Sequence, residues 1–92
     1  MHFFYVLYSL KDGKLYKGCS GQLGKRLIKH FNGGVPSTKH RRPLVLIYHE
    51  VFDNKSEALA RESWSKTAEG GLALKARLVD NRILSEKYDL II

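Results

Sequence analysis

The sequence has very little cysteine, few acidic residues in its first half and no long hydrophobic run. Its one cysteine, Cys19, cannot close an intramolecular disulfide, which excludes the disulfide-rich secreted scaffolds. No apolar run approaches the roughly 18 to 20 residues that cross a bilayer, and no basic stretch precedes an apolar one at the amino terminus. We therefore expect a protein of the reducing cytoplasm, without a membrane segment.

The length and composition limit the architecture. A chain of 92 residues leaves room for one domain with a small core. With 43% hydrophobic and 27% charged residues, the composition is typical of a soluble globular protein and not of a fibrous one. We expect a single domain over residues 1–92.

Acidic residues are scarce in one half of the chain only. Residues 1–50 carry nine Lys and Arg against two acidic residues, whereas residues 51–92 carry seven against seven. The whole formal excess of +7 therefore lies in the first half. A one-sided basic region is typical of proteins that bind a polyanion, usually nucleic acid. A solvated basic surface that only aids solubility is the alternative.

Two short runs of strand type open the chain. Residues 3–8 are aromatic and β-branched, and residues 14–18 form the second run. Between them, Asp12-Gly13 tolerates the positive φ angles of a type I′ turn. We predict a β-hairpin whose side chains alternate between its two faces.

The hydrophobic period then changes. Apolar residues recur four apart from Leu23 to Phe31, which predicts an amphipathic helix over residues 22–32. Ser20 is the expected cap of this helix and Gly33-Gly34 its expected end. Four side chains fall off the apolar stripe, as on an ordinary wet face: Lys25, Arg26, Lys29 and His30.

An irregular basic loop over residues 33–43 leads to a third strand. The near-continuous apolar start of residues 44–52 suggests a strand that is buried on both faces. Asn54, with Glu57 three residues later, has the pattern of a capping box that opens a second helix. The chain therefore predicts a small sheet covered by helices.

The second helix is expected to run to about residue 67, with Glu62 partly buried on the same face as Ala58. Gly70-Gly71 should end this segment. A weaker helical pattern follows over residues 72–86, and the last five residues are a tail or an added edge strand.

Hydrolysis of a phosphodiester needs a cation at the phosphoryl oxygens, a second positive donor and a group that steers or deprotonates water. Arg26, Glu62 as a metal ligand, and a tyrosine or histidine can supply all three. A single carboxylate is enough for Mg²⁺, because that ion keeps several waters and also takes phosphate oxygens. Taken singly, each residue fits an ordinary structural or surface role.

Four short segments stand in a fixed order and spacing. They are Phe3-Phe4-Tyr5, Leu15-Tyr16-Lys17-Gly18, Leu23-x-x-Arg26-Leu27-x-x-His30 and Ser56-Glu57-Ala58-x-x-x-Glu62-x-x-x-Lys66. Together they resemble the GIY-YIG nuclease domain, particularly its small stand-alone bacterial members, over residues 3–68. The resemblance implies an α/β (α+β) fold, with a small three-stranded antiparallel sheet that starts as a β-hairpin and is flanked by helices. It leaves residues 69–92 as a C-terminal helix and tail.

The resemblance also implies a site and an activity. The matching catalytic positions are Tyr5, Tyr16, Arg26, His30 and Glu62. The implied activity is endonuclease cleavage of DNA with Mg²⁺ or Mn²⁺ as cofactor, and branched or damaged DNA, as in DNA repair, is among the implied substrates. Glu62 would anchor the metal and Arg26 would hold the scissile phosphate, while either tyrosine could orient the attacking water.

The expected partner is nucleic acid, DNA first, with a protein partner or a second copy of the chain for targeting. Seven residues are expected to contact it: Lys17, Lys25, Lys29, Lys39, His40, Arg41 and Arg42. The alternative function is a module of the same fold that binds nucleic acid without cleaving it.

The segments depart from the family pattern without losing a proposed catalytic group. Phe3-Phe4 replaces the Gly-Ile of the first family triplet, and Lys17 replaces the apolar middle residue of the second. Cys19 lies where the family more often has Ser or Thr, and Gln22 lies where it more often has Asp. Two rival sites are weaker. Cys19 and the histidines lack the close spacing of a zinc site, and no third group orients a Cys19–His30 nucleophile pair.

Overall fold

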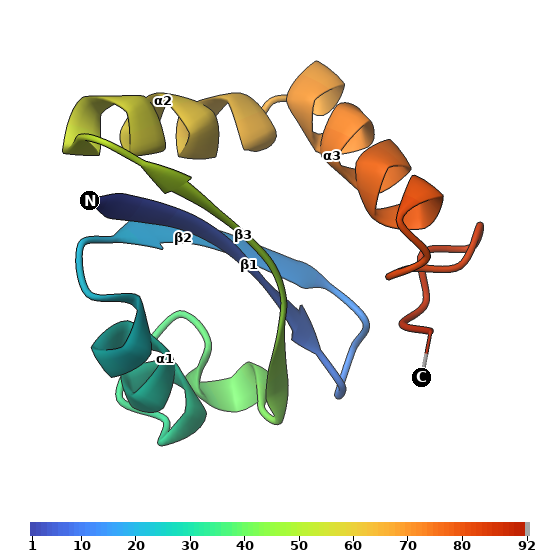
Figure 1. Ribbon diagram of the computed structural model, residues 1–92. Coiled ribbons are helices and arrows are strands. Elements are labelled where there is room, and N and C mark those ends of the chain that lie inside the picture. The colour runs from blue at the N-terminus through green and yellow to red at the C-terminus, as the bar shows by residue number, and fades with distance from the viewer. Residues whose placement is uncertain (92) are drawn as a thin grey trace.

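The computed structural model describes residues 1–91 and has the predicted order of elements (Figure 1). They are β1 (His2–Ser9), β2 (Leu15–Ser20), α1 (Leu23–Phe31), the short 3-10 helix η1 (Lys39–Arg41), β3 (Leu44–Phe52), α2 (Lys55–Ser65) and α3 (Ala68–Asp80). The strands form one antiparallel sheet in the order β2-β1-β3, which confirms the α+β class. None of the helices in residues 1–91 has the length and apolar character to cross a membrane.

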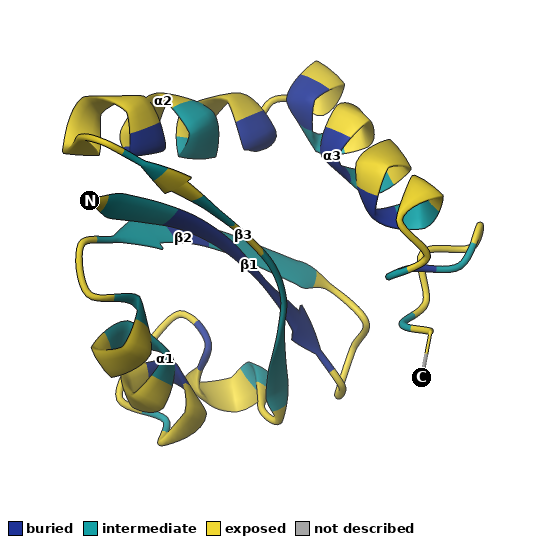
Figure 2. Cartoon of the chain, viewed as in Figure 1, coloured by how far each residue is buried: buried dark blue, intermediate teal, exposed yellow. Residues whose placement is uncertain are grey.

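Helices lie on both faces of the sheet. In Figure 1, α2 and α3 lie on one side of the strands, and α1 with η1 lies on the other. Alternation along β1 sends Phe4 and Val6 into a core with Leu74 and Leu78 of α3, and sends Tyr5 to the side of α1. Because both of its faces are covered, β1 is buried from Phe4 onward (Figure 2).

The strand buried on both faces is β1, and not β3 as the apolar run of residues 44–52 suggested. β3 lies at an edge of the sheet, and none of its residues is fully buried. Its apolar residues from Leu44 to Tyr48 are half-buried, and Ile47 and Tyr48 pack against the core. The apolar run therefore predicted the strand correctly and overstated its burial.

The β1–β2 hairpin is confirmed, but its type I′ turn is wrong. Only Gly13 in the turn has a positive φ, at +72°. The Ser9 N–H donates to the Lys14 carbonyl at 3.0 Å, and the Ser9 hydroxyl accepts the N–H groups of Lys11 and Asp12 at 3.2 Å each. These hydroxyl bonds stabilise a wider loop than two residues could make.

α1 is confirmed, but its expected cap is wrong. Gln22 occupies the N-cap position without a side-chain bond, and the Ser20 hydroxyl instead accepts the Gln22 N–H at 3.0 Å in the turn before the helix. Gly33 ends the helix at φ +80°, as expected of a glycine stop. His30, expected on a wet face, is the buried residue of α1.

α2 begins at its predicted cap. The Asn54 side chain accepts the Glu57 N–H and donates to the Glu57 carboxylate, both at 2.9 Å. Ala58 and Ser65 on the same helix are fully buried, and Glu62 between them is partly buried, as expected from their shared face.

The glycine pair does not end a segment, because it lies inside α3. Thr67 caps this helix and accepts the Gly70 N–H at 3.0 Å. A Cβ at Gly70 would collide with the Trp64 carbonyl, so the glycine allows α3 to start directly against the end of α2. Gly70 therefore serves a close approach of two helices, which a helix-stop rule cannot recognise.

Residues after α3 form a small closed loop and do not extend the sheet. Leu84 and Leu90 make an isolated antiparallel bridge, and Leu84 is buried in the core. The Ser85 N–H donates to the Asp89 carbonyl at 2.7 Å across this loop. The tail predicted for residues 88–92 is thus folded back as far as residue 91, and Ile92 lies outside the described residues.

Candidate active site

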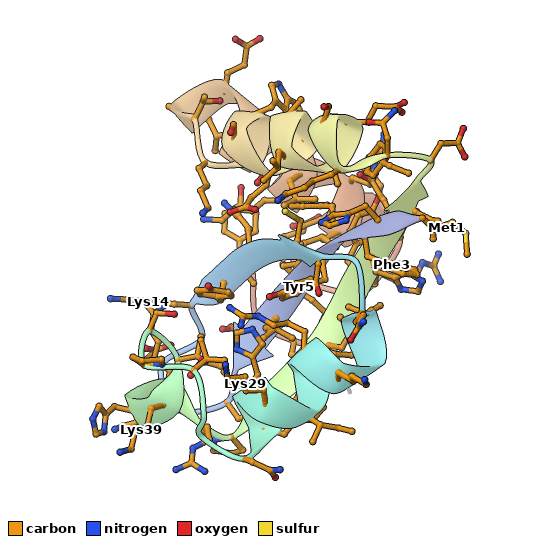
Figure 3. The ribbon with its side chains drawn as sticks, turned by 90° about the vertical axis from the view of Figure 1, so that its left-hand side faces the viewer. Met1, Phe3, Tyr5, Lys14, Lys29 and Lys39 are labelled. Atoms are coloured by element: carbon orange, nitrogen blue, oxygen red, sulfur yellow. The ribbon has the colours of Figure 1, made fainter. Side chains whose placement is uncertain are left out.

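Tyr5 and His30 meet between the sheet and α1, where Figure 3 places Tyr5. The Tyr5 hydroxyl is 2.9 Å from His30 Nε2, and His30 Nδ1 is 2.8 Å from the Thr38 hydroxyl. Tyr5 is 1% exposed and the other two residues are fully buried. A chain of hydrogen bonds therefore connects the central strand, α1 and the loop that follows α1.

Gly18 gives the Tyr5 side chain its room. Gly18 is the partner of Tyr5 across the β1–β2 ladder, and a Cβ at this position would lie 2.6 Å from the Tyr5 hydroxyl oxygen. Real Cβ contacts do not occur at that distance. Gly18 in the second segment is therefore required because the Tyr5 side chain of the first segment fills the space where a Cβ would lie.

Tyr16 and Arg26 complete this side of the site. The Tyr16 ring lies edge-on to His30 with centroids 5.2 Å apart, and the Tyr5 ring does so at 5.7 Å. Hydrogen bonding to Tyr5, together with the nearby Tyr16, raises the pKa of the Arg26 guanidinium. Both Tyr16 and Arg26 are half-buried, so they are the groups of this cluster that solvent reaches.

Glu62 comes from α2, on the other side of β2. Its carboxylate lies 2.6 Å from Lys66 Nζ and also interacts with the Cys19 thiol. Burial raises the pKa of Glu62, but hydrogen bonds from Cys19 and Lys66 outweigh it and hold the pKa below its usual value. Glu62 is close enough to Tyr5 to help raise the pKa of that phenol, after burial.

The structure brings four of the five predicted catalytic residues together on the α1 side of the sheet. Tyr5 and Tyr16 come from the hairpin, and Arg26 and His30 come from α1. Glu62 comes from α2 on the other side, beside Cys19 of the edge strand β2, and acts on the pKa of Tyr5 from there.

Two groups of the site stay uncharged near neutral pH. Burial, helped by Arg26, lowers the pKa of His30 to about 4. Burial, helped by Glu62, raises the pKa of Cys19 to about 11, so this thiol stays protonated and is a poor nucleophile. Cys19 pairs with Phe4 on the core side of the sheet, whereas His30 bonds Tyr5 on the opposite side, so a Cys19–His30 nucleophile pair is excluded.

The seven predicted nucleic-acid contacts fall into two groups. The exposed ones lie on α1 and around η1: Lys25, Lys29, Lys39, His40 and Arg42. Figure 3 shows Lys29 and Lys39 on the same side of the sheet as α1. Lys17 and Arg41 are half-buried, with Lys17 Nζ donating to the Ser65 carbonyl at 2.9 Å and Arg41 lying 3.6 Å from the Asp12 carboxylate.

Sequence reasoning missed two residues of the site. Thr38 accepts or donates at His30 Nδ1, and Lys66 holds the Glu62 carboxylate. Lys66 belongs to the fourth segment, and its place four residues after Glu62 brings helical side chains into contact, so its role could have been predicted. Nothing in the loop pattern indicates Thr38, because its contact depends on how the loop folds back against α1.

Comparison with known proteins identifies a family for most of the chain. Residues 1–70 match the model of the GIY-YIG catalytic domain. A UPF0213 protein of Staphylococcus saprophyticus is 52% identical over 67 residues, which are 72% of this chain and 80% of that protein. A UPF0213 protein of Bacillus pumilus is 48% identical over 67 residues, 72% of this chain and 67% of that protein.

A solved structure agrees with the fold. The solution NMR structure of a UPF0213 protein from Bacillus halodurans has 30% sequence identity and a TM-score of 0.52, over 83% of each chain. The family match contains all five predicted catalytic residues. The chain therefore belongs to the GIY-YIG family, a nuclease superfamily, and its relatives here are small bacterial UPF0213 proteins.

Proposed function

We propose that this protein is a metal-dependent endonuclease that hydrolyses phosphodiester bonds in DNA. The grouping of Arg26 and Tyr16 around His30, with an ionised Glu62 beside the same edge strand β2, carries this proposal. A fixed cation, a hydroxyl and a carboxylate are the three kinds of group that the reaction needs. The proposed nuclease domain is the single domain of residues 1–92.

Glu62 is the residue that fits a divalent cation. No group of three His, Cys, Asp or Glu side chains among residues 1–91 could hold a metal ion. A lone carboxylate suits Mg²⁺ or Mn²⁺, which bind hard oxygen ligands and complete their shells with water and phosphate oxygens. When bound, such an ion supplies charge stabilisation and a more acidic water. The lowered pKa of Glu62 supports this assignment, because the ligand must be ionised.

Arg26 is the residue proposed to hold the scissile phosphate. Arg26 is half-buried and charged at all working pH values, and the nearby Tyr5 and Tyr16 raise the pKa of its guanidinium. A cation placed in this way need not reorganise as negative charge develops on the phosphoryl oxygens.

Tyr16, and not Tyr5, is proposed to orient the attacking water. Tyr5 is 1% exposed and its hydroxyl is already bonded to His30, whereas Tyr16 is half-buried and reaches solvent. Tyr5 and His30 then act as positioning residues that fix Arg26 and the Tyr16 ring. A neutral His30 suits this role, because it adds no charge beside Arg26.

The cellular setting belongs to the same proposal. The exposed lysines of α1 and η1 would meet the DNA backbone, and a protein partner or a second copy of the chain would direct the enzyme to branched or damaged sites. A cytoplasmic location fits a nucleic-acid substrate and a lone, protonated cysteine.

One contact favours the alternative of a module that binds without cleaving. Lys66 Nζ lies 2.6 Å from the Glu62 carboxylate, so a metal ion must compete with a lysine for its ligand. A cleavage assay separates the two functions, with purified protein on branched, nicked and single-stranded DNA in Mg²⁺, Mn²⁺ or EDTA.

The matched variants are Glu62→Gln and Glu69→Gln, the second at an exposed carboxylate in the first turn of α3. Wild type and Glu69→Gln should cleave with metal only, and Glu62→Gln should lose activity on the order of 100-fold or more. Equal cleavage by wild type and Glu62→Gln would remove the role assigned to Glu62. A wild-type protein that binds DNA but shows no metal-dependent cleavage would establish the alternative, a module that binds nucleic acid without cleaving it.

A further inference from the structure

A cavity of about 310 Å³ lies at the end of the hairpin, outside the catalytic cluster. Its walls include Lys14 and Lys17 of the hairpin, Arg41 of η1, Lys75 of α3 and Tyr88 of the C-terminal loop. None of the described residues that line it is acidic. Lys75 and Tyr88 lie beyond residues 1–70, so the family match does not include this cavity as a whole.

The lining concentrates positive charge in one place. Burial, and then Lys75 and Lys66, lower the pKa of Lys17, as expected where like charges stand close together. Asp12 is an acidic neighbour of two of the lining residues, since its carboxylate lies 3.6 Å from Arg41 and accepts the Lys14 N–H at 2.9 Å. A concave surface lined by one sign of charge attracts an anion, and a phosphate group has the size and charge to fit.

Tyr88 adds an aromatic face to the charges. Its φ of +64° is a conformation that bulky side chains rarely adopt, and such residues are found where the surrounding structure holds them for a purpose. The Leu84–Leu90 bridge and the Tyr88 N–H bond to the Ser85 carbonyl at 2.8 Å hold the loop in place.

The ring itself remains available to a ligand. Lys75 Nζ lies 5.1 Å from the Tyr88 ring centroid, and the residue is still 41% exposed. A ring that is both fixed and exposed is suited to stacking against a nucleobase.

We propose that this cavity binds one nucleotide of a single strand of nucleic acid, with its phosphate among the four cations and its base stacked on Tyr88. The inference rests on the proposed function, since the strand held here would continue to the catalytic site. Lys17 is the chain neighbour of Tyr16, and both lie on the open edge strand β2. A strand that leaves the cavity along this edge therefore reaches the catalytic residues.

The test measures binding without cleavage, by fluorescence anisotropy of a short labelled single-stranded DNA in EDTA over a range of salt. The variants are Lys75→Gln, Tyr88→Ala and Tyr88→Phe, and the control is Lys87→Gln, an exposed lysine one residue from Tyr88 that is not in the lining. Thermal melting of each variant verifies that it is folded.

Lys75→Gln should weaken binding and reduce the log-log salt slope by about 0.7, the value for one phosphate contact on a single strand. Tyr88→Ala should weaken binding about 5- to 150-fold, the range for loss of one stacked base, while Tyr88→Phe and Lys87→Gln bind like wild type. Folded Lys75→Gln and Tyr88→Ala proteins that bind like Lys87→Gln would overturn the proposal.

A competition arm distinguishes a strand site from a site for a free nucleotide. A deoxynucleoside monophosphate should fail to displace the labelled strand, because the strand gains affinity from further contacts along β2. Displacement at concentrations near those of the strand would overturn the assignment to a strand. Because binding is measured in EDTA, it does not depend on cleavage. A wild type that never cleaves in Mg²⁺ or Mn²⁺ would therefore overturn the proposed function and leave the binding result standing.

Discussion

The Tyr5 hydroxyl lies 2.9 Å from His30 Nε2, and both side chains are almost fully buried between the sheet and α1. The Thr38 hydroxyl makes a hydrogen bond with the other ring nitrogen, Nδ1. Both nitrogens of the uncharged imidazole therefore have a hydrogen-bond partner. Burial and the nearby Arg26 keep His30 neutral, so the stability of this buried cluster depends on two of the proposed catalytic positions, His30 and Arg26.

His30 should make the fold less stable in mild acid. Its pKa of about 4 in the folded protein lies below the ordinary value of 6.5. Between these two values the unfolded chain takes up a proton that the folded chain does not, so the free energy of unfolding falls as the pH falls. The loss should reach about 3 kcal/mol near the lower value and vanish above the upper one.

Urea unfolding across this pH window measures the effect. His30→Gln should be less stable than wild type near neutral pH but should lack this part of the pH dependence. Parallel curves for the two proteins, with the same slope through the window, would show that His30 does not stay neutral in the fold.

The two tyrosines should fail in different ways. Tyr5→Phe leaves a buried ring nitrogen of His30 without its partner and should lower the free energy of unfolding by about 1 to 3 kcal/mol. Tyr16→Phe should leave stability nearly unchanged and lower the cleavage rate on the order of 100-fold. Unfolding curves and single-turnover rates measure the two effects, and a reversed pattern would assign the attacking water to Tyr5.

Cys19 should report on the charge of Glu62. Burial and Glu62 raise the pKa of the thiol to about 11, so iodoacetamide should label it slowly at mildly alkaline pH. Glu62→Gln removes the negative neighbour, lowers the pKa and should speed labelling, whereas Glu69→Gln should not. Mn²⁺ should speed labelling of wild type by neutralising the same carboxylate. An equal Mn²⁺ effect on wild type and Glu62→Gln would place the metal elsewhere.

Substitution of Gly18 and Gly24 by alanine tests how tightly the site is packed, because the added Cβ is crowded at Gly18 and not at Gly24. Gly18→Ala brings a Cβ to 2.6 Å from the Tyr5 hydroxyl and should cost about 1 to 3 kcal/mol of stability along with activity. Gly24→Ala, at a position in α1 with no atom within 4 Å of the added Cβ, should instead stabilise by about 0.5 to 1 kcal/mol. Thermal melting compares them, and a neutral Gly18→Ala would show that Tyr5 has room to move.

Local patterns were enough to predict most of the secondary structure. The Asn54–Glu57 cap, the Leu23–Phe31 periodicity and the hairpin all depend on residues close in the chain, and the structure confirms them. The resemblance of the four segments to the GIY-YIG nuclease domain was also enough to identify the family, which the match over residues 1–70 confirms.

What the sequence could not predict depends on contacts between distant segments. The place of β3 at a sheet edge follows from the strand order, and Gly70 inside α3 follows from its approach to Trp64. The burial of His30 needs Tyr5 and Thr38 on either side of the ring, which no helical pattern reveals. The basic cavity combines four parts of the chain, namely the hairpin, η1, α3 and the C-terminal loop, and was missed for the same reason.

The metal-binding role of Glu62, on which the proposed nuclease depends, is tested most directly by a crystal soaked in Mn²⁺. The expected result is an anomalous peak bound by a Glu62 oxygen beside Tyr16 and Arg26, with Lys66 displaced from the carboxylate. A crystal that shows no ion there, with Glu62 still paired to Lys66, would contradict the nuclease and leave a protein that binds nucleic acid without cleaving it.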